Sequence, residues 1–193
     1  DLEEVLWAKG KQMRADTIRE DYENNQPLDE ILHEEAMQEF YHYCIVGGMP
    51  AAVKADLAKD SPIEQTEIRQ MLLNSYIPDI PKYANQSDTV RIFEAYDSLR
   101  GILTENYVAI ALKTNGYDLH YWESDNTAEV DFLIQKDSHV IPVECKAGNH
   151  VKAKSMMVYM EKYAPVYAIR ISARNFGMVN GIKAVPLYSV FCI

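Results

Sequence analysis

Hydrophobic residues recur every three or four positions along the first half of the chain, as they do on one face of a helix. The pattern is clearest from Leu28 to Val46, and Gly47-Gly48 ends it. Ser61-Pro62 is an N-cap followed by a proline at the first helical position, which marks another helix start. The predicted helices cover residues 28–46, 50–57, 61–76 and 88–99. We therefore predict a small all-helical subdomain over residues 1–99.

The second half changes to the shorter period of β-strands. One helix is predicted over residues 103–114 and another over residues 152–163. The predicted strands cover residues 119–122, 130–135, 139–145, 166–171 and 184–192. The core order α-β-β-β-α-β, followed by the last strand, predicts an α/β domain over residues 100–193, in which helices flank a sheet.

A hairpin in this domain places charged residues opposite one another. If Asp137-Ser138 form its tip, the numbers of paired residues sum to 275, so Asp131 faces Glu144 and Glu129 faces Lys146. Because side chains alternate along a strand, these four residues share one charged face. The opposite face is apolar and comprises Val130, Phe132, Ile134, Ile141, Val143 and Cys145.

Two carboxylates directly opposite each other destabilise a sheet unless a cation lies between them. The side chains of Asp131 and Glu144, with the backbone carbonyl of Cys145, would suit octahedral Mg²⁺ or Mn²⁺. Lys146 could hold an attacking hydroxide and stabilise charge on a phosphorane. Glu105, on the preceding helix, could extend the carboxylate cluster. These residues predict a metal-dependent phosphodiesterase site.

A simpler interpretation stays open. An edge hairpin with an exposed charged face would form ion pairs from Glu129 and Asp131 to Lys146, and such pairs add little stability and have no chemical role. Glu105 could equally be an ordinary solvated helix residue.

Charge and composition limit the functions further. Residues 1–100 hold 10 basic and 20 acidic residues, whereas residues 101–193 hold 9 of each. Basic residues concentrate between Lys146 and Lys183, where we expect any contact with DNA. The three cysteines have no C-x-x-C spacing, which predicts reduced thiols. No stretch resembles a signal peptide or a membrane span, so we expect a cytoplasmic protein without a membrane partner.

The segments Glu129 to Ile134 and Ile141 to Lys146 resemble the D…ExK signature of the PD-(D/E)XK nuclease superfamily, although Val130 stands where that superfamily has proline. Its archaeal Holliday junction resolvases add a helical glutamate like Glu105. The resemblance implies a restriction-endonuclease-like fold, metal binding by Asp131 and Glu144, and a catalytic Lys146.

Five blocks along the chain also resemble prokaryotic ATP-binding proteins in which an AAA-type core precedes a C-terminal domain of unknown function. The blocks are residues 1–8, 46–53, 76–83, 101–108 and 182–188. The G-x-x-x-x-G-K-[ST] loop is absent, so the resemblance implies a fragment whose ATP site lies in a missing N-terminal core. It also implies homo-oligomers through that core, and a winged-helix-like segment missing near residues 99–101.

Two functions therefore stay open. The first is Mg²⁺-dependent hydrolysis of DNA. The second is a non-catalytic interaction module that couples the ATPase to a protein or nucleic-acid partner.

Overall fold

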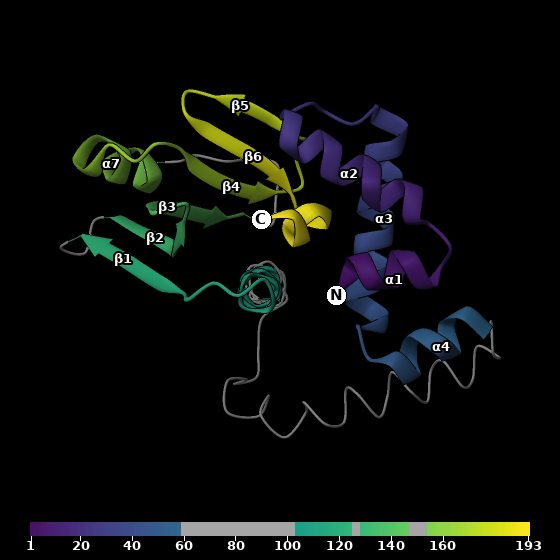
Figure 1. The fold of residues 1–193 in the computed structure, drawn as a ribbon. Helices are drawn as coiled ribbons and strands as arrows, with labels where there is room; N and C mark the ends of the chain where they lie inside the picture. The colour runs from purple at the N-terminus through teal and green to yellow at the C-terminus, as the bar shows by residue number, and fades with distance from the viewer. Residues whose placement is uncertain (59–102, 125–127, 147–153) are drawn as a thin grey trace, which may run out of the picture.

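The computed structural model describes residues 1–58, 103–124, 128–146 and 154–193, and these residues form helices around one mixed sheet (Figure 1). The described helices are α1 (Leu2–Ala8), α2 (Gln12–Asn24), α3 (Glu30–Val46), α4 (Pro50–Ala58), a helix of residues 103–114, α7 (Lys154–Tyr163) and the 3-10 helix η2 (Leu187–Cys192). The described strands are β1 (His120–Ser124), β2 (Ala128–Lys136), β3 (His139–Cys145), β4 (Ala168–Ser172), β5 (Gly177–Val179) and β6 (Ile182–Pro186).

The sheet has six strands in the order β1-β2-β3-β4-β6-β5. Strands β1, β2 and β3 pair antiparallel, β4 is parallel to both β3 and β6, and β5 returns antiparallel to β6. The predicted order α-β-β-β-α-β is confirmed from the helix of residues 103–114 to β4, so the fold is mixed α/β. The hairpin β2–β3 lies inside the sheet and not at its edge.

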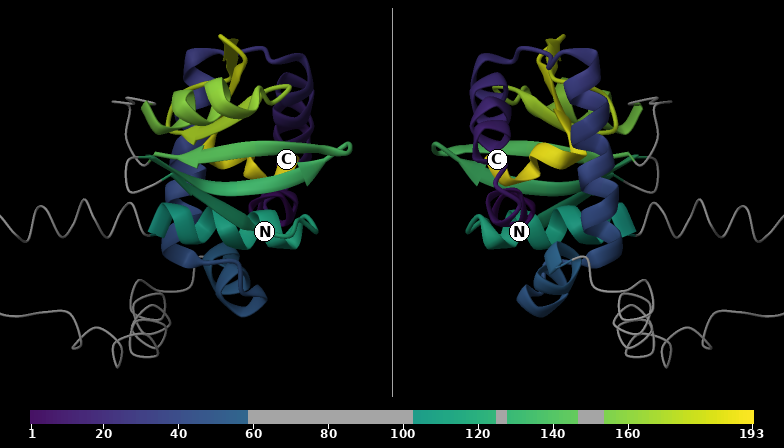
Figure 2. Two further views of the ribbon diagram at one scale, coloured as in Figure 1. Left: turned by 90° about the vertical axis from the view of Figure 1, so that its left-hand side faces the viewer. Right: turned by 90° about the vertical axis from the view of Figure 1, so that its right-hand side faces the viewer.

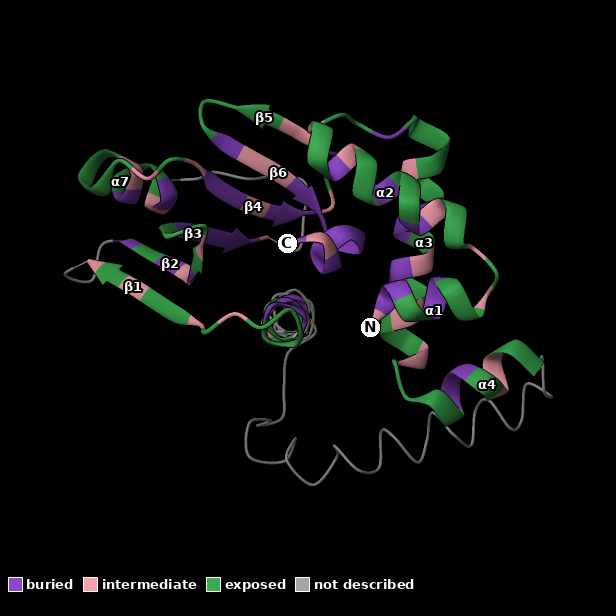
Figure 3. Cartoon of the chain, in the orientation of Figure 1, coloured by how far each residue is buried: buried purple, intermediate pink, exposed green. Residues whose placement is uncertain are grey.

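Two apolar clusters hold the layers together. In Figure 2 the sheet lies between α7 on one side and the helix of residues 103–114 on the other. The smaller cluster joins α7 to the sheet and comprises Val130, Met156, Tyr159, Ala168 and Ile182. The larger cluster joins the other face of the sheet to the helix of residues 103–114, to η2 and to α1–α3. Figure 3 shows this burial concentrated in β3, β4 and η2.

The N-terminal helices begin and end at residues suited to those positions. Asp1 and Glu4 form a capping box at the start of α1, and the Asp29 side chain accepts the Ile31 N–H at the start of α3. Asn25 ends α2 in the left-handed region, with φ 52°. These caps satisfy backbone groups that would otherwise lack partners at the helix ends.

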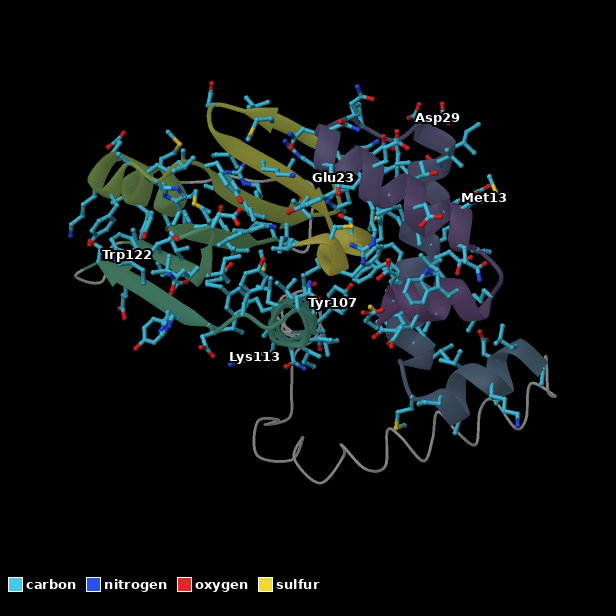
Figure 4. All side chains as sticks on the ribbon, viewed as in Figure 1. Met13, Glu23, Asp29, Tyr107, Lys113 and Trp122 are labelled. Atoms are coloured by element: carbon cyan, nitrogen blue, oxygen red, sulfur yellow. The ribbon has the colours of Figure 1, made fainter. Side chains whose placement is uncertain are left out.

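Tyr107 joins the helix of residues 103–114 to the N-terminal helices (Figure 4). Its ring lies 5.0 Å from Phe40 and 6.1 Å from Tyr43, centroid to centroid, and its hydroxyl donates to the Leu187 carbonyl at 3.3 Å. Leu2 and Leu6 of α1 belong to the same large cluster. One continuous core therefore includes side chains from both halves of the chain.

The predicted last strand, residues 184–192, is wrong over most of its length. Strand β6 ends at Pro186, and residues 187–192 form η2 instead. Proline has no N–H with which to continue the ladder, and Leu187 to Phe191 are all buried between the sheet and the helices. A continuous apolar run fits either a buried strand or a buried helix, so its periodicity could not distinguish the two. Strand β5 was not predicted.

The predicted helices over residues 61–76 and 88–99, and the junction at residues 99–101, lie outside the described residues. Within residues 1–58, 103–124, 128–146 and 154–193, no helix is both long and apolar enough to cross a bilayer.

Candidate functional site

The β2–β3 hairpin has the predicted tip and register. Asp137 and Ser138 have φ of 50° and 65°, as a two-residue type I′ turn requires at both central positions. Phe132 pairs with Val143, and each pair from there to the turn preserves the sum of 275. The pairing ends at Phe132 and Val143, however, so the predicted ladder pairs Asp131–Glu144 and Glu129–Lys146 are not formed.

The ladder changes at Asp131. Its Oδ2 accepts the backbone N–H of Cys145 at 2.6 Å, a donor that a regular antiparallel ladder would pair with the Val130 carbonyl. Val130 consequently lies with the α7 cluster, so its predicted place beside Phe132 and Ile134 is wrong. The other five residues of the predicted apolar face belong to or pack against the large cluster, as expected. A side chain that replaces a backbone partner locally shifts the strand, as in a bulge.

Glu144 is buried and is held by cations. It lies between two members of the large cluster, so strand alternation turns its side chain toward the α7 face. Its Oε1 lies 3.4 Å from Lys146 Nζ, and its Oε2 lies 3.6 Å from Arg170 Nε. Arg170 is also its partner in the parallel register of β3 and β4. We call Glu144, Lys146 and Arg170 the charge triad.

The charge triad is mostly removed from water. The side chains of Glu144 and Arg170 are 5% and 15% exposed, whereas Lys146 is 39% exposed and reaches the surface. Glu144 Oε2 and the Arg170 nitrogens Nε and Nη2 have no hydrogen-bond partner among the described residues. The triad is therefore held chiefly by Coulomb attraction, which is stronger in this weakly polar surrounding than in water.

Asp131 has acidic neighbours. Partial burial raises its pKa, the Cys145 N–H and Lys146 lower it, and Glu129 raises it further. Glu105, exposed on the helix of residues 103–114, also has a raised pKa, first from partial burial and then from Asp131. We call Glu105, Glu129 and Asp131 the acidic cluster. The structure thus brings predicted Glu105 near Asp131 and Lys146.

Cys145 takes part in the candidate site through its backbone groups and not through its thiol. Burial raises the pKa of its thiol well above the usual value. The next residue, Lys146, donates its backbone N–H to the Ile171 carbonyl at 2.8 Å. The Cys145 carbonyl, a predicted metal ligand, therefore lies in a peptide unit anchored to β4.

The described side chains do not fit a resident divalent ion in this arrangement. Among the residues that the structure describes, no group of three or more His, Cys, Asp or Glu is placed to hold a metal. Glu144 is already neutralised by two basic side chains, and Asp131 uses one oxygen for the Cys145 N–H. The expected Mg²⁺ or Mn²⁺ site stays a prediction.

Sequence reasoning did not assign Arg170 to the site, although the sequence carries a signal for it. Arg170 is the charged residue within Ala168–Ser172, a strand whose other members are buried. A lone arginine in such a strand requires a buried partner, because an unpaired buried charge is costly. Its partner, Glu144, becomes apparent only when β3 and β4 are placed side by side.

Three of the basic residues in the segment expected to contact DNA make contacts with other residues of the chain. Lys183 Nζ lies 3.5 Å from the Tyr22 ring centroid and donates to the Tyr22 carbonyl at 2.7 Å, and burial lowers its pKa to about 8. Lys162 lies over the ring of Trp122, 5.9 Å from its centroid, and Arg170 belongs to the charge triad. Arg170 and Lys183 are therefore not part of an open basic surface, whereas Lys162 stays exposed on α7.

A surface pocket of about 320 Å³ lies between α2 and α3. Its lining residues are Lys11, Met13, Arg14, Thr17, Leu28, Leu32 and Ala36. The two basic residues at its rim pair with Glu39 and Glu35 of α3. Met13, in this lining, and Ile31 of α3 are 84% and 67% exposed, so the helical layer offers an apolar surface within acidic surroundings.

Comparison with known families gives two partial matches. Residues 100–190 match a domain of unknown function (DUF4143), and residues 37–120 match a second domain of unknown function (DUF8612). No curated protein and no solved structure matches the chain. The sheet, the charge triad and the helix of residues 103–114 thus fall within a segment similar to DUF4143.

Proposed function

We propose that this chain is a non-catalytic interaction module that couples an ATP-binding core to a protein partner. The observation that supports this proposal is the charge triad, in which buried Glu144 is neutralised by Lys146 and Arg170. A carboxylate already paired with two cations has little need of a metal ion. The ATP-binding core is proposed from the resemblance to AAA-type proteins.

We propose further that the module uses a restriction-endonuclease-like fold. The order α-β-β-β-α-β and the hairpin that carries Asp131, Glu144 and Lys146 support this assignment. In this view the chain retains the fold of a nuclease, and Arg170 lies beside Glu144, the glutamate of the D…ExK signature. Two of the basic residues expected to contact DNA, Arg170 and Lys183, make internal contacts instead.

The partner surface that we propose is the pocket between α2 and α3. Residues 1–58 hold 13 acidic and 5 basic residues, which would repel a phosphate backbone and attract a basic protein surface. The apolar pocket fits a hydrophobic side chain of the partner, flanked by lysine or arginine. This charge complementarity favours a protein over a nucleic acid.

Calorimetric titration of Mn²⁺ tests the non-catalytic assignment without requiring a known substrate. We expect no binding heat with the wild-type protein or with the Asp131→Ala/Glu144→Ala variant. We also expect no cleavage of single-stranded, duplex or four-way-junction DNA in Mg²⁺ or Mn²⁺. Binding that disappears in the double variant would contradict the proposal.

The partner surface is tested in a longer protein that contains the ATP-binding core. Leu32→Glu should abolish retention of one defined protein, whereas Ile110→Glu, on the exposed side of the helix of residues 103–114, should not. Retention should also depend on ATP. Retention that is indifferent to ATP and to Leu32→Glu would exclude coupling through this pocket.

Metal-dependent phosphodiester hydrolysis is the second candidate. The acidic cluster supports it, because Glu105 and Asp131 both have raised pKa values and so would gain from a bound cation. Asp131 would hold the metal, and Lys146 would orient the attacking water. Mn²⁺ binding lost in Asp131→Ala but retained in Glu129→Gln would favour this candidate.

A further inference from the structure

The parallel register of β3 and β4 fixes how Glu144 is neutralised. Glu144 and Arg170 are register partners, and each is flanked along its strand by members of the large cluster. Alternation therefore turns both side chains to the α7 face of the sheet. Lys146 follows Glu144 by two residues, so it lies on the same side. The strand positions of Glu144, Lys146 and Arg170 thus bring one buried carboxylate and two cations together on the α7 face of the sheet.

We propose that Arg170 acts as a built-in cation that occupies the place of a divalent metal at Glu144. This inference rests on the proposed non-catalytic function and gives it a specific residue. The approach of Arg170 Nε to Glu144 Oε2 is 3.6 Å, and both atoms are buried without another partner among the described residues. Arg170 is therefore a positioning residue that keeps Glu144 unavailable to other cations.

Charge balance explains why Arg170, and not Lys146, controls the site. Arginine stays charged at every accessible pH, and its flat guanidinium suits a buried carboxylate better than a hydrated ammonium does. Lys146 is 39% exposed, so water screens its share of the attraction, whereas Arg170 is 15% exposed. Removing the Arg170 charge would leave Glu144 buried beside one partly solvated cation. That carboxylate would then accept a metal ion.

Three variants test this inference, with Mn²⁺ as the probe. Arg170→Met removes the charge and keeps much of the volume, Arg170→Lys keeps the charge, and Arg170→Met/Glu144→Gln removes both charges. Thermal unfolding is measured for each protein with and without Mn²⁺, and Mn²⁺ binding is measured by calorimetry.

Arg170→Met should lower the melting temperature by roughly 6–12 °C, because it leaves a buried carboxylate undercompensated. Mn²⁺ should recover part of this loss in Arg170→Met, and should have no effect on the wild type, Arg170→Lys or the double variant. The double variant should melt above Arg170→Met. A double variant that folds when Arg170→Met does not would also support the inference.

Other outcomes overturn it in distinguishable ways. If the wild type binds Mn²⁺ through Glu144, both this inference and the proposed function fail. If the wild type is inert but Arg170→Met melts like the wild type or ignores Mn²⁺, the proposed function stands and the role of Arg170 is wrong. If Arg170→Met and the double variant are equally unstable, Arg170 acts independently of Glu144, and the inference is again excluded.

Discussion

Glu144 and Asp131 are two carboxylates on neighbouring strands that differ in their burial and in their charged neighbours. Glu144 is almost fully buried and lies beside two cations, one of them supplied by β4. Asp131 is half-buried, and of its charged neighbours Lys146 lowers its pKa whereas Glu129 raises it, while Asp131 itself raises the pKa of Glu105. The comparison shows that the register of a neighbouring strand, more than burial itself, decides whether a carboxylate is stabilised.

The largest expected effect is the loss of the Glu144 charge. Glu144→Gln should reduce the free energy of unfolding by about 3 kcal/mol, because it leaves Arg170 buried without its counter-charge. Urea unfolding measures this change. The matched control is Glu129→Gln, an exposed residue of β2, which should stay within about 0.5 kcal/mol of the wild type. Equal losses in the two variants would remove the distinction between the charge triad and the acidic cluster.

Asp131→Asn should instead increase the free energy of unfolding. The amide oxygen can still accept the Cys145 N–H, while the variant removes a charge that is disfavoured first by burial and then by Glu129. We expect a gain of about 1 kcal/mol at pH 7, allowing for solvent screening. Because the folded pKa of Asp131 is raised, its charge costs stability above that pKa and costs nothing below the unfolded value of 3.8.

The gain from Asp131→Asn should therefore shrink as the pH falls toward 4. Parallel urea titrations of both proteins at several pH values measure it. A gain that is unchanged at acidic pH would mean that the charge of Asp131 is not its source.

Glu105→Gln should change mainly the pKa of Asp131. Asp131 raises the pKa of Glu105, and because the repulsion between two charges is reciprocal, removing the Glu105 charge should lower the pKa of Asp131. The change in stability should be about 0.5 kcal/mol or less, since Glu105 is exposed and screened. The Asp131 carboxyl resonance, followed by NMR, reports the shift. An unaltered Asp131 titration would show that these two acids do not interact.

The smallest effect concerns an exposed ion pair, Arg14–Glu35 at the rim of the pocket. Glu35→Gln should change the free energy of unfolding by about 0–0.5 kcal/mol, and 1 M salt should remove even that difference. Urea unfolding at low and high salt tests the point. A loss as large as that from Glu144→Gln would mean that burial does not distinguish the charge triad from ordinary surface pairs.

The local elements of the fold could largely be predicted from the sequence. The helices of residues 30–46 and 103–114 and the β2–β3 hairpin follow from periodicity and turn residues. The hairpin of β5 and β6 was missed although Asn180-Gly181 has the positive φ values and the residue types of a type I′ turn. Segment 187–192 could not be assigned, because its shape depends on being packed between two layers.

The candidate site shows the same limit. The sum of 275 identified the partners from Phe132 and Val143 to the turn, because a two-residue turn fixes a hairpin register, but the predicted pair Asp131–Glu144 is not formed. It could not show that the Asp131 side chain would take the Cys145 N–H, or that Arg170 would lie beside Glu144. Both depend on how the strands pair and pack in three dimensions.

The position of η2 has a consequence for synthesis of the protein. Helices α1 and α2 bury Leu2, Leu6 and Ile18 in a cluster that also contains Leu187, Tyr188 and Val190. At ribosomal speed, roughly ten to forty seconds separate the emergence of these two sets of residues. During that interval α1 and α2 can pack on each other and on α3 but lack η2, and closing so long a loop slows folding. We expect the nascent chain to depend on chaperones until η2 leaves the ribosome.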